Sequence, residues 1–280
     1  MKITKELLRE KGACAAGYRD FLKEFPEEKY PDGVEYQDLL DCCAEKNFNY
    51  GSWLLSVFGV TDDVRKVDGD LITEKSIIFA GRLEVSGSIK AGEGIKAGCG
   101  IKAGCGIEAG WGIEAGCGIK AVCGIEAGCG IKAVCGIEAG WGIEAGCGIK
   151  AGWDIKAGCG IKAGEGIKAG WGIEAGCGIK AGWGIEAGCG IKAVCGIEAG
   201  WGIEAGWGIK AGWGIKAGWG IKAGWGIEAG CGIKAGWGIK AGCEFGIYAG
   251  LRVGITSEYR KIIAKTKPEN IMCGEFVEVT

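Results

Sequence analysis

Residues 99–122 read CGIKAGCGIEAGWGIEAGCGIKAV, which is four copies of one six-residue unit. The unit extends in both directions, so that Ile occupies every sixth position from Ile89 to Ile239, 26 times in succession. The phase continues backwards to Leu71, and a two-residue insertion at residues 243–245 interrupts it near the far end. This hexad repeat covers about two thirds of the 280 residues.

A period of six fits neither the 3.6 residues of a helical turn nor a plain alternating strand. It fits a strand of about three residues followed by a tight corner, repeated so that successive turns stack into a β-solenoid. Side chains alternate along a strand, so Ile and Ala of each hexad should face the core and the Lys or Glu between them should face solvent. The Gly residues on both sides of the corner residue should supply the unusual backbone conformations of the corner.

The first position of the hexad, two residues before Ile, is the corner residue. It holds Cys twelve times, Trp eleven times, Glu twice and Gly once. A close-packed interior cannot exchange a thiol for an indole, or bury an unpaired carboxylate, at one structural position. We therefore expect this side chain to project outward, although Trp and Cys are usually buried.

Three hexads per turn would make a triangular prism with about 18 residues per turn, and two would make a flattened solenoid with about 12. The charges after Ile hardly separate the two, because 13 of 23 stacked pairs are opposite at a spacing of 18 and 12 of 24 at a spacing of 12. One Ile and one Ala per side fill a triangular core, so three hexads per turn are favoured. The predicted fold is mainly β: a triangular parallel β-helix of roughly nine regular turns with a small N-terminal all-α domain.

Four segments are predicted along the chain. Residues 1–60 show apolar residues at helical spacing, punctuated by Gly and Pro, and are expected to form a domain of four short helices. Residues 61–70 are expected to be a linker, residues 71–256 the solenoid, and residues 257–280 a C-terminal capping segment. Caps at both ends would block the edges on which further strands add.

Composition excludes several kinds of function. The chain has no His, which removes Ser-His-Asp triads, His general bases and His-containing metal sites. The interleaved 16 Lys and 10 Glu after Ile lack the clustered positive charge of a nucleic-acid interface. The charged N-terminus lacks the apolar region of a signal peptide, and no apolar run is long enough to span a membrane, so a cytoplasmic location is expected. We expect no enzymatic activity and no cofactor.

The 17 Cys are expected to be mostly free thiols in a reducing compartment. The hexad cysteines follow C-x5-C spacing instead of the C-x2-C pairs of zinc sites, and neighbours in sequence fall on different corners of a prism. We therefore expect no metal site. On a prism with three hexads per turn, however, cysteines such as Cys159, Cys177 and Cys195 would stack on one corner, near enough for disulfides under oxidising conditions.

The tryptophans are the strongest candidates for a binding site. On a prism, one corner would carry the column Trp183, Trp201, Trp219 and Trp237, and another corner would carry Trp207 and Trp225. Exposed aligned aromatic rings suit a partner surface, because Trp is enriched at binding hot spots. The alternative is that each ring lies over the flanking Gly residues and shields the corner from water. Both interpretations stay open.

Two resemblances accompany these patterns. Residues 79–92, FAGRLEVSGSIKAG, with the hexads that follow, resemble the polymer-forming bactofilin-type β-helix, which implies a right-handed triangular solenoid. The head, with EKGAC at residues 10–14 and WLL at residues 53–55, is similar to a helical module of uncharacterised bacterial and prophage proteins that often precedes GIKAGW repeats. Bactofilins polymerise through exposed solenoid ends, whereas a helical domain occupies one end here, so filaments are not expected.

The expected function is that of a non-catalytic protein-binding or scaffold protein, in which the head and the rod engage different partners. The prophage resemblance implies a role against a host factor. Two alternatives remain: a regulatory or enzymatic head with the solenoid as a rigid spacer, and a self-assembling structural protein of bactofilin type. Oligomerisation through the head is left open.

Overall fold

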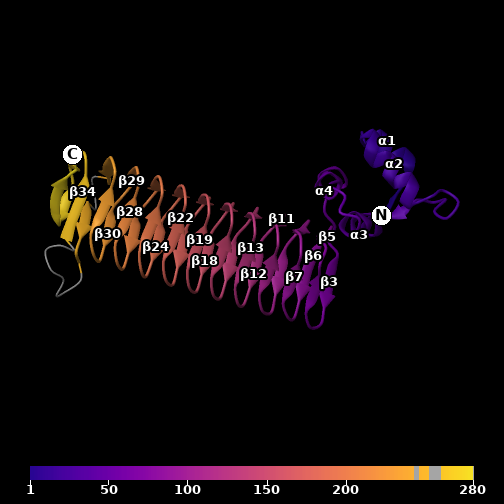
Figure 1. Cartoon of the computed structure of the whole chain (residues 1–280), viewed down its shortest axis with the longest axis horizontal. Coiled ribbons are helices and arrows are strands. Elements are labelled where there is room, and N and C mark those ends of the chain that lie inside the picture. Colours follow the sequence, from indigo (N-terminus) through magenta and orange to yellow (C-terminus); the bar gives the residue numbers. More distant parts are fainter. Residues whose placement is uncertain (243–245, 252–259, 280) are drawn as a thin grey trace.

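The computed structural model shows a small helical head followed by a straight three-sided rod (Figure 1). It describes residues 1–242, 246–251 and 260–279. The mainly β architecture with a small N-terminal helical region agrees with the prediction.

The head contains four helices, as predicted. These are α1 (Lys5–Glu10), α2 (Ala15–Glu24), α3 (Tyr36–Glu45) and α4 (Gly51–Phe58). A short antiparallel pair, β1 (Lys2–Ile3) and β2 (Val34–Glu35), joins them. The buried apolar residues of the head pack into one cluster that includes Ile3, Leu8, Phe21, Val34, Tyr36, Leu39, Leu40 and Leu54.

Three parallel sheets form the sides of the rod, and each is named here by its first strand. The first turn holds β3 (Val64–Val67), β4 (Leu71–Thr73) and β5 (Ile77–Phe79), and β6 (Arg82–Val85) begins the second. From β7 (Ile89–Ala91) to β28 (Ile215–Ala217) every strand runs from the Ile to the Ala of its hexad. The last regular strands are β29 (Gly220–Ala223), β30 (Ile227–Ala229), β31 (Ile233–Ala235) and β32 (Gly238–Lys240). Beyond them lie β33 (Ile247–Ala249), β34 (Lys261–Ala264), β35 (Ile271–Cys273) and β36 (Glu275–Glu278).

The register confirms three hexads per turn. Each regular strand pairs with the strand three places on, so that Ile107 lies opposite Ile125 and Ala109 opposite Ala127. Among the described residues, the β3 and β4 sheets have twelve strands each and the β5 sheet has ten. Every hexad Ile from Ile89 to Ile233 is at most 2 % exposed, so Ile and Ala form one continuous core as predicted.

The two glycines of a corner have different roles, and the prediction that both supply unusual backbone conformations is wrong. The described glycines with positive φ all lie outside the regular hexads, at positions 12, 33, 59, 69, 246, 250 and 274. The glycine after Ala is in the tighter place: a Cβ on Gly182 would lie 1.9 Å from the carbonyl oxygen of Gly164, one turn below, so the backbone must shift where Val stands there. The glycine before Ile has room, since a Cβ on Gly184 would lie 3.5 Å from its nearest neighbour atom.

The solenoid begins earlier than predicted, because β3 lies inside the expected linker at residues 61–70 and pairs with β6. Arg65 occupies the place one turn below the buried Leu83, where the repeat has Ile. Its guanidinium lies 3.8 Å from the Asp41 carboxylate of α3. The first turn has no turn beneath it, so its inward position does not require an apolar residue, and the hexad pattern is lost there.

Helix α3 covers the exposed edge of the β5 sheet. The Gln37 amide donates a hydrogen bond to the carbonyl oxygen of Ile78 (2.8 Å) and accepts one from the backbone N–H of Ala80 (3.1 Å). This side chain replaces the next strand, and the Ser52 hydroxyl of α4 contacts the Lys96 ammonium beside it. The predicted N-terminal cap is therefore present on this one sheet.

The described part of the predicted C-terminal cap is further solenoid instead. Strands β34 and β36 extend the β4 sheet, and β35 extends the β3 sheet. In the last turn Glu278 lies opposite Ala264, at a position that faces the core in every regular turn. A carboxylate there disfavours the addition of another strand. Residues 243–245, 252–259 and 280 of the predicted segments lie outside the described residues.

Rows of charge run along all three faces of the rod. Ten Lys–Glu ion pairs join adjacent turns at the position after Ile, with N–O distances from 2.5 to 3.5 Å. Glu198 contacts both Lys180 (3.5 Å) and Lys216 (3.1 Å). The hydrogen bond from Lys216 is the main reason that the pKa of Glu198 lies below its ordinary value of 4.5. Exposed pairs such as these contribute little individually.

Two charge reversals on the β4 sheet should have opposite effects on stability. Glu126 lies between Glu108 and Glu144, so Glu126→Lys creates alternating charges and should raise the thermal midpoint by about 1–3 °C. Glu198→Lys creates a row of like charges and should lower it by a similar amount. Thermal melts at low and high salt measure both changes, which should shrink as salt screens the charges. Shifts of the same sign in the two variants would contradict the role given to the rows.

Thermal melts of the wild type and of Glu198→Gln at decreasing pH test whether the ionised carboxylate of Glu198 stabilises the fold. Because its folded-state pKa is lowered, its contribution is present above 4.5 and is lost as the pH falls through the folded-state value. The difference in stability between the wild type and Glu198→Gln should therefore disappear at acid pH.

A candidate binding groove along the β5 sheet

The predicted tryptophan columns are present. Trp183, Trp201, Trp219 and Trp237 follow one another on the corner that precedes the β5 sheet, and backbone hydrogen bonds join each to the next. Ring centroids are 6.1 Å apart between Trp201 and Trp219 and 4.9 Å apart between Trp219 and Trp237. On the corner before the β3 sheet, Trp207 and Trp225 stack at 5.1 Å with nearly parallel planes.

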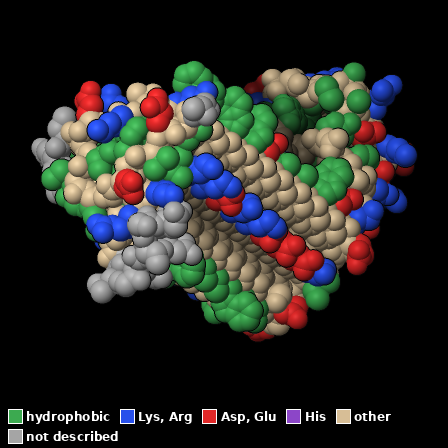
Figure 2. All heavy atoms as spheres, turned by 60° about the vertical axis from the view of Figure 1, so that its left-hand side comes forward, with side chains coloured by type: hydrophobic (Ala, Val, Ile, Leu, Met, Phe, Trp, Pro, Cys, Tyr) green, Lys and Arg blue, Asp and Glu red, His purple; other side chains and the backbone are tan. Residues whose placement is uncertain are grey.

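The corner residues project into solvent as expected. The eleven hexad tryptophans are 46–67 % exposed, although stacked neighbours cover part of many rings. Space-filling atoms show hydrophobic side chains gathered along edges of the rod, beside flat strips of backbone and rows of mixed charge (Figure 2). Each tryptophan column is therefore the border of a flat face.

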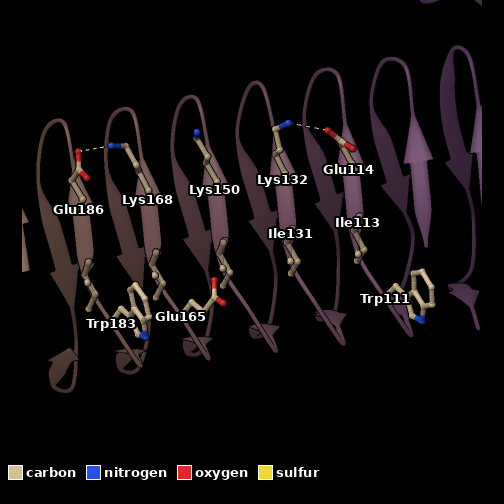
Figure 3. Close-up of a pocket in the computed structure, with 18 of the residues that line it drawn as sticks. Trp111, Ile113, Glu114, Ile131, Lys132, Lys150, Glu165, Lys168, Trp183 and Glu186 are labelled. Atoms are coloured by element: carbon tan, nitrogen blue, oxygen red, sulfur yellow. Dashed lines mark hydrogen bonds and ion pairs between the residues drawn. The ribbon is translucent and has the colours of Figure 1, made fainter. Parts of the chain in front are cut away.

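A shallow groove of about 1170 Å³ runs along the β5 sheet. Trp111, Trp183, Trp219 and Trp237 are on one wall, and the Lys and Glu residues after Ile form the other. Figure 3 shows this arrangement, with Trp111, Glu165 and Trp183 on one side, the charged row on the other, and Ile113 and Ile131 between them. The floor is mainly the backbone of glycine and isoleucine, which allows close approach by a ligand.

The charged wall has an excess of lysine at its centre. Lys132 pairs with Glu114 at 2.9 Å, and Lys168 pairs with Glu186 at 2.7 Å. Lys150 lies between the two lysines and forms no ion pair with any residue that the structure describes (Figure 3). Its ammonium group is therefore available to a ligand of the groove.

The groove continues to the head. Asn47, Phe48, Asn49 and Ser52, from the α3–α4 connection and the start of α4, line its N-terminal end. At the other end, the Lys265 ammonium lies 5.4 Å from the Trp237 ring centre, in cation–π geometry. The tryptophans were predicted from the repeat, but these four head residues were not. The position of the head residues beside the groove depends on how α3 covers the edge of the β5 sheet.

A second groove, of about 1430 Å³, follows the β4 sheet and has Trp141 on its border. Trp207 and Trp225 border the β3 sheet and do not line the groove that reaches the head. The predicted site residues are thus divided: four share the corner of the β5 groove and two lie on another corner. The β5 groove is the better candidate because it combines the long aromatic column with the head.

The head holds a separate cavity of about 280 Å³ with a mainly apolar lining that includes Leu8, Phe21, Phe25, Leu39 and Trp53. Tyr50 donates a hydrogen bond to Asp20 there (2.9 Å). Burial raises the pKa of Cys43 to about 12, which keeps its thiol protonated. A protonated, buried thiol of this kind is a poor nucleophile.

Comparison with known proteins adds one finding. Residues 1–58 match the family model of the YdhT N-terminal domain, which covers the head. No curated protein and no solved structure matches the chain. Within the described residues, no helix has the length and apolar character needed to cross a membrane.

Proposed function

We propose that the protein is a non-catalytic binding scaffold whose β5 groove engages an extended segment of a partner protein. The observation that carries the proposal is the exposed column Trp183, Trp201, Trp219 and Trp237, of which all members except Trp201 line a groove that reaches the head. The head offers a second surface next to the start of the groove, so one partner can contact both.

Stacking makes the column suitable for binding. Each ring in contact with a neighbour is already restricted, so little side-chain entropy is lost when a partner covers it. Rigid aromatic side chains with large apolar area are the residues that carry most energy at protein interfaces. The mixed charges of the opposite wall suit a partner of mixed charge better than a polyanion.

Other features support a soluble adaptor over a polymer. Arg65 in the first turn and Glu278 in the last turn stand where the core would require apolar residues if another copy stacked end to end. This disfavours the bactofilin-type alternative. The described cysteines are all free thiols, which supports a cytoplasmic location. A role against a host factor, as in prophage proteins, rests on the resemblance of the head. The apolar lining of the head cavity gives little support to an enzymatic head.

The test compares two pairs of stacked tryptophans with nearly the same geometry. Trp201 and Trp219 belong to the column beside the groove, and Trp219 lines it. Their ring centroids are 6.1 Å apart and their planes are at 24°. Trp153 and Trp171 lie on the corner before the β3 sheet, at 6.3 Å and 26°. The double variant W201S/W219S should lose at least tenfold in partner capture from a native cell lysate, whereas W153S/W171S should capture normally.

Thermal melts of the same variants separate binding from corner shielding. If the rings bind a partner, both double variants should melt within a few degrees of the wild type. A large loss of stability in both, with capture reduced in both, would support shielding and contradict the proposal. Equal capture by all three proteins would also contradict it.

A further inference from the structure

Most hexad cysteines stand directly above or below another cysteine. Ten of the twelve belong to vertical ladders on the three corners, and backbone N–H to O hydrogen bonds join each member to the next. The ladders are Cys99–Cys117–Cys135, Cys105–Cys123, Cys129–Cys147 and Cys159–Cys177–Cys195. Only Cys189 and Cys231 among the hexad cysteines have no such neighbour.

The geometry brings two thiols together in adjacent turns. Neighbouring strands of a sheet lie about 4.8 Å apart, and in-register residues project their side chains in the same direction. The backbone N–H of Cys117 donates to the carbonyl oxygen of Cys99 (2.8 Å), and that of Cys147 donates to Cys129 (2.9 Å), so the two side chains of each pair start one strand spacing apart. The described cysteines form no disulfide, so these pairs are dithiols.

The lack of further ligands near each cysteine pair restricts which metal ion the pair can bind. No group of three or more Cys, Asp or Glu gathers closely enough to bind a metal ion in the described part of the chain. Tetrahedral Zn²⁺ needs four ligands, whereas Cu⁺ accepts two thiolates in a linear arrangement. A linear sulfur–metal–sulfur unit spans two metal–sulfur bonds, about 4–5 Å, close to the strand spacing of ~4.8 Å.

We propose that each cysteine ladder is a binding site for a soft monovalent cation, Cu⁺, held by two thiolates from adjacent turns. This differs from the expectation of no metal site, which considered cysteines close in sequence; the ladders join residues three hexads apart.

Binding is an exchange of two protons for one cation: Cu⁺ and two R–SH give Cu(SR)₂⁻ and two H⁺. No electron is transferred, and copper stays in the +1 state. Each thiol must lose its proton before it binds the ion. Affinity should therefore increase with pH.

The chain offers a matched pair of variants for the test. Cys117 and Cys189 occupy the same corner, but Cys117 lies between Cys99 and Cys135, whereas Cys189 lies between Trp171 and Trp207. Cys117→Ser leaves Cys99 and Cys135 two turns apart, about 10 Å, which is too far for one ion. Cys189→Ser removes a thiol that has no vertical partner.

The experiment titrates the reduced full chain anaerobically with Cu⁺, supplied as its acetonitrile complex, against a chromophoric Cu⁺ chelator. The wild type should bind at least four ions, and Cys117→Ser should bind one fewer. Cys189→Ser should bind as many as the wild type, and two protons should be released per ion in weakly buffered solution. Circular dichroism confirms that each variant is folded.

Three results would overturn the proposal. The first is an equal loss of ions in the two variants, which would mean that total thiol count sets the stoichiometry. The second is no loss in Cys117→Ser. The third is binding of Zn²⁺ with the same stoichiometry and the same dependence on Cys117, which would show that the ladders do not select two-coordinate cations.

Discussion

Ile161→Ala in the middle of the rod is expected to lower the free energy of unfolding by about 2–4 kcal/mol. Ile161 is 1 % exposed and lies between Ile143 and Ile179 in the adjacent turns of the β4 sheet. Backbone hydrogen bonds hold the turns at a fixed spacing, so the rod cannot close around the missing side chain and a cavity remains.

The matched control for this substitution is Ile72→Ala on the same sheet. Ile72 occupies the outward position of β4 and is 62 % exposed, so its loss should cost less than about 0.5 kcal/mol. Urea unfolding followed by circular dichroism measures both variants. Similar losses in the two would mean that the Ile stack does not hold the turns together.

Alanine at two glycines of one corner is expected to change stability in opposite directions. Gly182→Ala should destabilise the protein by about 1–3 kcal/mol, because the new Cβ meets a carbonyl oxygen one turn below. Gly184→Ala should stabilise it by about 0.5 kcal/mol, because there is room for the Cβ and the unfolded chain loses freedom. Unfolding curves of the two single variants provide the measurement.

Natural departures from the repeat support this difference. Asp154 replaces the glycine before Ile, and its carboxylate accepts a hydrogen bond from Gly172 N–H at 2.8 Å. Val replaces the glycine after Ala at positions 122, 134 and 194, where the backbone hydrogen bonds are 3.4, 3.2 and 3.2 Å, at or beyond the upper end of the 2.8–3.2 Å that glycines show there. A side chain after Ala thus lengthens the backbone hydrogen bond, most clearly at Val122, whereas the side chain of Asp154 before Ile adds a hydrogen bond. Stabilisation by Gly182→Ala would contradict the steric account.

Much of the fold could be predicted because a strict repeat imposes the same environment many times. The variation between Cys and Trp at one position required an outward side chain, and this requirement fixed the direction of Ile and Ala. The tryptophan columns followed from three hexads per turn. These inferences used only sequence period and packing density.

The ends of the rod could not be predicted in the same way. Arg65 and Glu278 break the apolar pattern because the outermost turn has an unpaired side, so strands β3 and β36 looked like linker and cap. The reach of the groove to the head depends on Gln37, whose hydrogen bonds replace a strand at the β5 edge. A polar helix residue gives no sign of that role in the sequence.

The strict vertical register also governs how this gene can change in length. Losing one hexad before Trp183 would move every later residue to the next side of the rod, so that its aromatic column would leave the β5 corner for the β4 corner. Losing or duplicating three consecutive hexads would instead shorten or lengthen the rod and keep every later column on its own side. The number of hexads can therefore change without altering the faces of the rod only in multiples of three. A gain or loss of one or two hexads should instead change which side of the rod carries each later residue.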